Sequence, residues 1–350
     1  MTETDGDSHR GFWSAPHSRR DWWGAAIALV VLCGLGALAA TSIDFAELQH
    51  ALGKVDLYLI GAGFLFMIGA FLARGESWFV VIDAALPDAH ISRVPVTRAL
   101  LIGMATSSVT PGRLGEFARA WLVARRLGPP RQHLVVVAGT LVAQTLMNLL
   151  ALIILTVIAL LGGGIAHGKT EGLLAVVAIP LGILLVAFLA PSALARTARQ
   201  RTGRIASSVN WLAGQIVAAR RGLSAFGHLA KLLHSVGAQL GAWALQLGCC
   251  YVTLRAFNLH VSAALAAAAG VLVATNLTAI VPITPSNVGV FQAATIAVLA
   301  GFGVSAGAAL AYGLVLQGIE VVSALALGGL SLINEGVPWT QLRSRSGEAQ

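Results

Sequence analysis

The sequence predicts an all-α polytopic membrane protein with about six full spans and two interrupted (re-entrant) helix pairs arranged as an inverted repeat. Three observations lead to this fold class. Hydrophobic residues make up 57% of the 350 residues and charged residues only 11%, whereas a soluble domain carries about 25% charged residues. Long apolar runs recur along the whole chain, and two of them are broken by the same short motif.

Six apolar runs are expected to cross the bilayer as full helices. About 20 mostly apolar residues are needed to cross a hydrocarbon core of roughly 30 Å. The uninterrupted runs that can serve lie at residues 22–40, 57–73, 134–161, 173–190, 236–254 and 306–333. Two other runs are interrupted, so that 94–109 is followed by 117–123 and 261–281 by 288–300. Each interrupted pair is expected to leave the membrane on the side that it entered.

The two interruptions carry one motif. Residues 110–117 and 284–291 share the pattern Thr-Pro-x-x-Leu/Val-Gly-x-Phe and begin about half a chain length apart. The same shift carries the run at 57–73 onto 236–254 and the run at 134–161 onto 306–333. Each half then holds three crossings and one interrupted pair, and an odd number of crossings inverts the second half. Inverted repeats with broken helices are typical of transporters.

The distribution of Lys and Arg predicts the orientation. The expected organisation is a disordered cytoplasmic tail at 1–21, a first membrane repeat at 22–162, a second repeat at 163–333 with a basic cytoplasmic loop at 193–234, and a cytoplasmic tail at 334–350. Only Lys54, Arg113, Lys169 and Arg255 of the 23 basic residues then lie outside the cytoplasm, which matches the positive-inside rule. We expect a multi-pass plasma (inner) membrane protein with both termini cytoplasmic. The basic residues behind the net charge of +8 are then expected to interact with anionic lipid and not with nucleic acid.

The paired motifs predict helix starts inside the membrane. Thr is a good N-cap and Pro is favoured at the first helical position, so Thr110-Pro111 and Thr284-Pro285 are each expected to begin a helix near mid-membrane depth. A helix N-terminus attracts anions, including phosphate. Two opposed N-termini together with Arg113 would therefore suit an anionic head group. The alternative is a proline kink that only shapes packing.

Charged residues inside the apolar runs are further candidates, because charges at this depth are costly and usually functional. Arg113, Glu116 and Arg119 lie three residues apart on one helical face, and the alternative role is an internal ion pair. Glu320 lies mid-way along the last run, where the alternative role is a hydrogen bond to a neighbouring helix. Arg74 lies at the inner end of the second run, where an arginine near a tryptophan is often an interface anchor.

These residues together form the predicted substrate-binding set. Its members are Arg74, Thr110, Pro111, Gly112, Arg113, Gly115, Glu116, Arg119, Thr284, Pro285, Gly289 and Glu320. The sequence contains no nucleophile elbow, phosphate-binding loop or metal-ligand cluster. We therefore predict no catalytic residues, no metal and no cofactor.

Both motifs resemble a known family. Thr110-Pro-Gly-Arg-Leu-Gly-Glu-Phe-Ala-Arg119 resembles the first motif of the flippase-like transmembrane region of lysylphosphatidylglycerol synthases, and Val281-Pro-Ile-Thr-Pro-Ser-Asn-Val-Gly-Val-Phe291 resembles the second. The resemblance covers about residues 22–333. It implies a bacterial or archaeal plasma-membrane protein that binds or moves phospholipids or lipid-linked substrates.

The chain departs from that family in two places, and we expect it to lack one domain of the full synthases. The second motif usually has Gly-Gly where this chain has Ser286-Asn287, and usually an acid where it has Gln292. A role for that acid cannot be carried over. The residues after Ile333 are too few for the soluble aminoacyl-transfer domain of the full synthases. The chain is therefore not expected to make lysylphosphatidylglycerol by itself.

Three functions remain open at this stage. The first is a flippase-like protein that binds or translocates an anionic phospholipid or a polyprenyl-phosphate-linked substrate. The second is a membrane glycosyltransferase-type enzyme, for which Asp83 and Glu116 are the nearby candidate bases. The third is a non-transporting partner of an envelope-lipid enzyme. The expected partners are membrane lipids with anionic head groups, with a homo-oligomer or an envelope-enzyme complex as further alternatives and no nucleic acid.

Overall fold

The computed structural model describes residues 45–110, 114–161, 227–259, 261, 263–279 and 284–335. The predicted spans at 22–40 and 173–190 lie outside these residues. So do the N-terminal tail, the chain beyond residue 335 and most of the basic loop at 193–234. Residues 111–113 also lie outside them, so Pro111, Gly112 and Arg113 have no structural account here.

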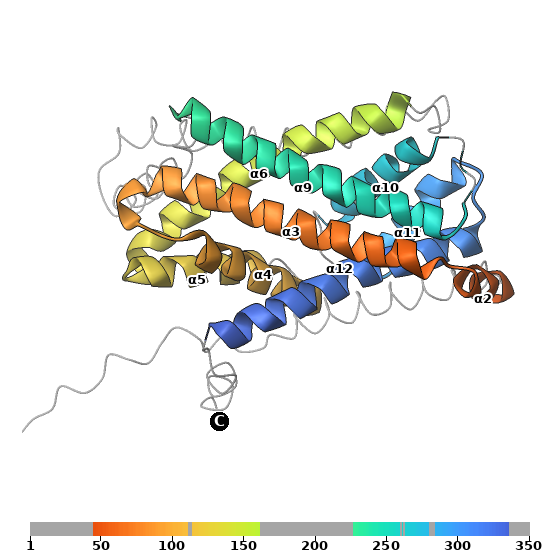
Figure 1. Ribbon diagram of the computed structural model, residues 1–350, viewed down its shortest axis with the longest axis horizontal. Coiled ribbons are helices and arrows are strands. Elements are labelled where there is room, and N and C mark those ends of the chain that lie inside the picture. Colours follow the sequence, from red (N-terminus) through yellow and green to blue (C-terminus); the bar gives the residue numbers. More distant parts are fainter. Residues whose placement is uncertain are drawn as a thin grey trace, which may run out of the picture. The chain divides into compact units, whose positions relative to one another are not determined.

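The described residues form helices and contain no strand (Figure 1). In chain order the helices are α2 (Phe45–Gly53), α3 (Leu57–Ala85), η1 (Pro87–Ala89), α4 (Arg93–Val109), α5 (Leu114–Leu127), α6 (Pro130–Leu161), α9 (Leu229–Ala256), α10 (Ala264–Thr278), η3 (Pro285–Asn287), α11 (Val290–Ala300) and α12 (Ala306–Asn334).

Three of these helices are long and apolar enough to cross a membrane. They span Leu57–Ala85, His133–Leu161 and Ala306–Asn334. Large apolar side chains stay exposed on them, including Leu65 on α3 and Leu330 on α12. Lipid tails accept such faces, whereas water penalises them. The shorter helices α10 and α11 are also apolar, as expected for the arms of an interrupted pair.

Helix α3 is longer than its apolar run predicts. It continues past residue 73 to Ala85, because the polar residues in its second half are accommodated inside the protein. Trp78 is fully buried, and its Nε1 donates to Oγ1 of Thr140 at 2.9 Å. Arg74 therefore lies within the helix. The alternative that Arg74 and Trp78 form an interface anchor is wrong.

Helices α3 and α9 pack side by side and run antiparallel. At one end the backbone N–H of Asp56 donates to the carbonyl of Ala256 at 3.0 Å. At the other end Lys231 Nζ lies 2.8 Å from Asp83 Oδ2. The start of each helix is therefore next to the end of the other (Figure 1).

The neighbour relations of the first four helices recur in the second four. Helices α3, α4, α5 and α6 follow one another as long, short, short and long, and so do α9, α10, α11 and α12. Helix α4 packs on α12, and α10 packs correspondingly on α6. Helix α3 packs on α4, as α9 does on α10. The described helices of the two halves thus share this order and these contacts.

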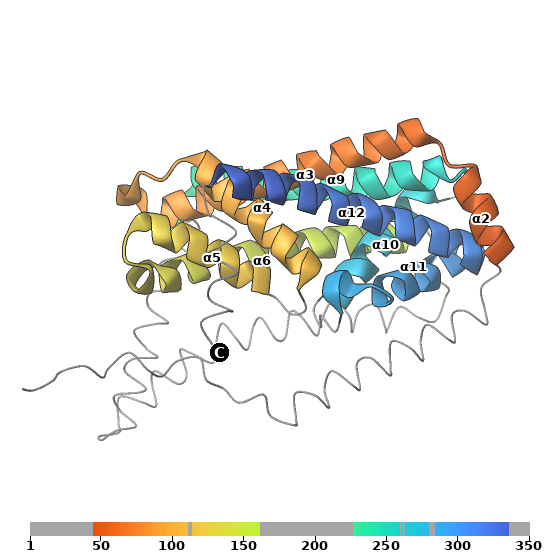
Figure 2. The same ribbon diagram turned by 90° about the horizontal axis from the view of Figure 1, so that it is seen from below.

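Each interrupted pair forms a hairpin, and the two hairpins lie toward opposite ends of the bundle (Figure 2). The arms of the first hairpin, α4 and α5, approach each other at two glycines. A Cβ at Gly115 would lie 1.9 Å from the carbonyl oxygen of Gly103. A Cβ at Gly103 would lie 2.6 Å from the carbonyl oxygen of Gly115. Only glycine at both positions permits this packing.

Candidate functional site

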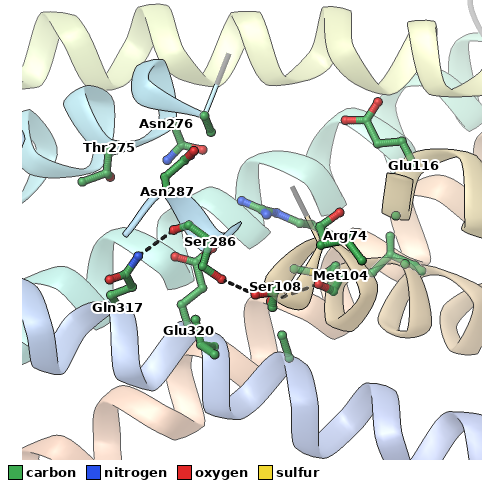
Figure 3. A pocket seen from close by; sticks show the side chains of 18 of the residues that line it. Arg74, Met104, Ser108, Glu116, Thr275, Asn276, Ser286, Asn287, Gln317 and Glu320 are labelled. Atoms are coloured by element: carbon green, nitrogen blue, oxygen red, sulfur yellow. Dashed lines mark hydrogen bonds between the residues drawn. The ribbon is translucent and has the colours of Figure 1, made fainter. Parts of the chain in front are cut away.

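The two hairpins meet at their broken tips. The Ser286 Oγ, in η3, donates to the carbonyl oxygen of Ser108, near the end of α4, at 2.8 Å (Figure 3). Both motifs therefore lie at helix breaks inside the bundle. Neither lies within an uninterrupted helix.

A cavity of about 320 Å³ adjoins this junction. Its lining comes from both halves of the chain and includes residues of α3, α4, α5, α6, α9, α10, η3, α11 and α12. Seven of the predicted site residues line it, namely Arg74, Thr110, Gly115, Glu116, Arg119, Thr284 and Glu320. Gly289 is not among the described lining residues. The fold thus brings together predicted residues that are up to half a chain apart.

Arg74 presents a guanidinium group to the cavity from the middle of α3 (Figure 3). Its Nη2 donates to Oε1 of Gln246 on α9. The guanidinium carbon lies 5.4 Å from the centroid of the Trp243 ring, in a cation–π contact. Its Nε is buried and has no hydrogen-bond partner among the described residues. A permanently charged group is therefore held in a fixed position at the cavity wall.

Glu320 supplies the opposite charge from α12. It lines the same cavity as Arg74, and the two side chains interact electrostatically. They do not form a direct ion pair in the described part of the chain. The carboxylate is half-buried because it faces the open cavity. The Arg74 guanidinium and the Glu320 carboxylate therefore face the same cavity.

Helix α5 adds a second pair of opposite charges, Glu116 and Arg119, one turn apart. The guanidinium carbon of Arg119 lies 5.0 Å from the centroid of the Trp78 ring, and its Nη1 donates to Oε1 of Gln144 at 3.1 Å. Each cavity arginine is thus stacked on a buried tryptophan and bonded to a glutamine. Such contacts hold a long side chain in one orientation.

The threonine hydroxyls do not cap the following helices as predicted. The Thr110 hydroxyl donates to the Thr106 carbonyl at 2.6 Å and so belongs to the end of α4, while α5 begins at Leu114. The Thr284 hydroxyl donates to the Val288 carbonyl at 3.0 Å. Helix α11 is capped at Gly289 instead. The prediction that Thr284 is a side-chain cap is wrong, because a short 3₁₀ turn separates it from the α-helix.

A family model for the lysylphosphatidylglycerol synthase TM region matches residues 24–328, nearly the whole chain. The chain belongs to this family. No curated protein and no solved structure matches it significantly. Membership of the lysylphosphatidylglycerol synthase transmembrane family, together with the apolar helices, makes this a membrane-embedded multi-pass protein related to lipid handling.

The first departure from the lysylphosphatidylglycerol synthase motif has a backbone explanation. Ser286 and Asn287, at the positions where Gly-Gly is usual, have φ values of 50° and 55°. This left-handed region is natural for glycine, and Asn tolerates it better than most other residues. The serine also gains the bond that joins the two tips.

The second departure is Gln292, which stands where the family usually has an acid. Its Oε1 accepts from the backbone N–H of Gly289 at 2.7 Å, which caps α11. Its Nε2 donates to Oε1 of Gln317, and the Gln317 Nε2 donates to the Ser286 carbonyl at 2.6 Å. The N–H of Gly289 is therefore already used. This bond gives Gly289 a structural role at the start of α11.

Changing Gln292 to Glu should destabilise the protein. An ionised carboxylate can still accept from Gly289 but cannot donate to Gln317, so one buried chain of bonds is broken. The loss should be about 1–3 kcal/mol, read as a lower thermal midpoint in detergent. Gln49→Glu, the same change at an exposed position on α2, is the matched control and should have little effect. Equal midpoints for both variants would contradict this role for Gln292.

Sequence reasoning missed several polar lining residues. Ser107 and Ser108 end the first arm, Thr275 and Asn276 end the corresponding arm of the second hairpin, and all four line the cavity. The signal was present, because each polar pair interrupts an apolar run shortly before its break.

Asp83, proposed as a base for the enzyme alternative, pairs with Lys231 and is not among the lining residues. The described residues contain no metal-binding cluster.

Proposed function

We propose that this protein binds the anionic head group of a phospholipid or lipid-linked substrate in the cavity and moves the lipid between leaflets. The observation that carries the proposal is Arg74, a permanent charge in the middle of an apolar helix with a buried Nε that has no described partner. Charged residues within the apolar helices of a membrane protein usually mark substrate pathways. Guanidinium groups match the geometry of phosphate oxygens.

The packing supports an alternating-access mechanism. An inverted repeat would account for the antiparallel pairing of α3 with α9 and for the recurring contacts of the two halves. Both hairpin tips border the cavity, so rocking one half against the other would expose it to either leaflet in turn. Transporters with inverted repeats place their substrate sites at such broken helices near the bilayer midplane.

The decisive test is lipid movement by the purified full chain in vesicles. Fluorescently labelled phosphatidylglycerol in the inner leaflet should become accessible to an external quencher faster than in protein-free vesicles. Labelled phosphatidylcholine, which carries a compensating positive charge on its head group, should move more slowly. No acceleration with either lipid would refute the transport function.

Orientation supplies a further prediction. The proposed topology places both termini and the η1 end of the bundle in the cytoplasm, because the described residues Arg93, Arg126 and Lys231 gather at that end. After Cys33, Cys249 and Cys250 are replaced by Ala, an impermeant thiol reagent should label Gly301→Cys from outside intact cells and should miss Asp88→Cys. An engineered cysteine at Lys169 should also be labelled, and one at Arg201 should not. Strong external labelling at residue 88 or 201 would contradict the orientation.

A further inference from the structure

The balance of charge in the cavity has a consequence for transport. Among the described lining residues, Arg74 and Glu320 carry opposite charges that offset each other. Glu116 and Arg119 also cancel each other. A lipid phosphate that binds Arg74 adds one negative charge to this space. An uncompensated charge inside a membrane protein is costly.

Glu320 is the cavity carboxylate whose electrostatic partner is Arg74, so it is the one best placed to remove this excess charge. Its carboxylate faces the cavity and has no hydrogen bond to a described residue, while its electrostatic partner is Arg74. A phosphate on Arg74 takes that partner away. If the carboxylate then takes a proton from water, the described lining residues and the bound phosphate together carry no net charge.

The other groups around Glu320 do not offer this compensation. From α9, Cys249 interacts electrostatically with Glu320, but a thiol is already neutral and adds no positive charge. From α12 itself, the Tyr312 hydroxyl donates to the Cys250 carbonyl at 3.0 Å. Helix α4 contributes only uncharged lining residues, and α11 contains no ionisable residue. His50, on the neighbouring α2, is exposed and does not line the cavity.

We propose that Glu320 is a proton-binding site, and that one proton is taken up when an anionic head group binds Arg74. The proton passes from bulk water to a carboxylate oxygen of Glu320, and no covalent bond of the lipid changes. Lipid with a single negative charge and proton then cross together without net charge movement. The proposal rests on the proposed function, and it adds the coupling ion and the residue that carries it.

The first experiment measures proton uptake by the purified full chain in detergent. The probe is short-chain phosphatidylglycerol, added to weakly buffered protein with a pH-indicator dye. The wild type should take up about one proton per lipid bound, and infrared difference spectra should show a new protonated-carboxyl band. Glu320→Gln should bind the lipid without the uptake and without the band. Glu320→Asp keeps a carboxylate and should restore both.

The matched control removes a carboxylate that does not line the cavity. Asp83→Asn breaks the surface pair with Lys231 and should leave proton uptake unchanged. Uptake of equal size in Glu320→Gln would overturn the proposal. Lipid binding by the wild type without uptake would overturn it too, but would leave the head-group site standing. Absence of binding in the wild type would overturn both.

The second experiment measures coupling in vesicles. A pH gradient should accelerate the movement of labelled phosphatidylglycerol by the wild type, roughly tenfold per pH unit if the step is limited by protonation, and a proton ionophore should abolish the effect. Movement by Glu320→Gln should be independent of the gradient. A gradient response that persists in Glu320→Gln would assign the coupling to another group and refute the proposal.

Discussion

Replacing Arg74 by glutamine should slow lipid movement roughly ten- to a hundredfold, which corresponds to the loss of a charged hydrogen bond of about 1.5–3 kcal/mol. The physical reason is that Arg74 provides a fixed charge to the cavity. Glutamine can still bond to Gln246 but cannot attract a phosphate. The rate of labelled phosphatidylglycerol movement in vesicles measures the effect.

Two further variants separate charge from packing. Arg74→Lys keeps the charge but loses the planar fork and the stacking on Trp243, so it should recover only part of the rate. Arg93→Gln removes an arginine that contacts Glu76 outside the cavity and should leave the rate unchanged. If Arg74→Gln moved lipid as fast as Arg93→Gln, the head-group site would be in the wrong place.

Replacing Gly115 by alanine should destabilise the protein by about 3 kcal/mol or more, at the upper end of the cost of overpacking. The added Cβ would lie 1.9 Å from the Gly103 carbonyl oxygen and 2.2 Å from Ser107 Oγ. The first of these atoms belongs to the backbone, so no side-chain rotation relieves the clash and the two arms must separate. The thermal midpoint in detergent should fall, and lipid movement should fall with it because Ser107 and Glu116 line the cavity.

Gly61→Ala is the matched control for this change. It is the same substitution at an exposed position on α3, where the added Cβ has no atom within 4 Å. Alanine favours helix over glycine by about 1 kcal/mol, so the control should be neutral or slightly stabilised. Equal midpoints for the two variants would show that α4 and α5 are not in close contact at Gly115.

Most of the described fold could be predicted from the sequence because its signals are local. Apolar runs predicted α6, α9 and α12, and the Thr-Pro motifs predicted the two breaks. The prediction of where a helix ends failed where polar residues within the helix form hydrogen bonds with residues far away in the sequence. The second half of α3 looked like the end of a span, since Arg74, Glu76 and Ser77 follow the apolar run, but Gln246 and Ser235 of α9 contact this segment.

The roles of the motif residues depended on the same kind of contact. Thr284 has the residue type of an N-cap, but the intervening 3₁₀ turn moves the cap to Gly289. Gly115 was predicted to bind substrate, yet its lack of a side chain is required by the facing carbonyl of Gly103. Neither fact is encoded in residue type or spacing alone. Both follow from how closely two backbones approach.

The sequence by itself determined that the chain is a helical membrane protein with a repeated, twice-broken pattern, because hydrophobicity and helix breaking act over short stretches of chain. It also supplied most of the candidate charged residues, since a charge in an apolar run is conspicuous. Only the tertiary structure decided that Arg74 and Glu320 share one cavity, and that Gln292 caps a helix. Those results depend on which helices pack together across half the chain, and the free energy of that packing is a sum over many distant contacts.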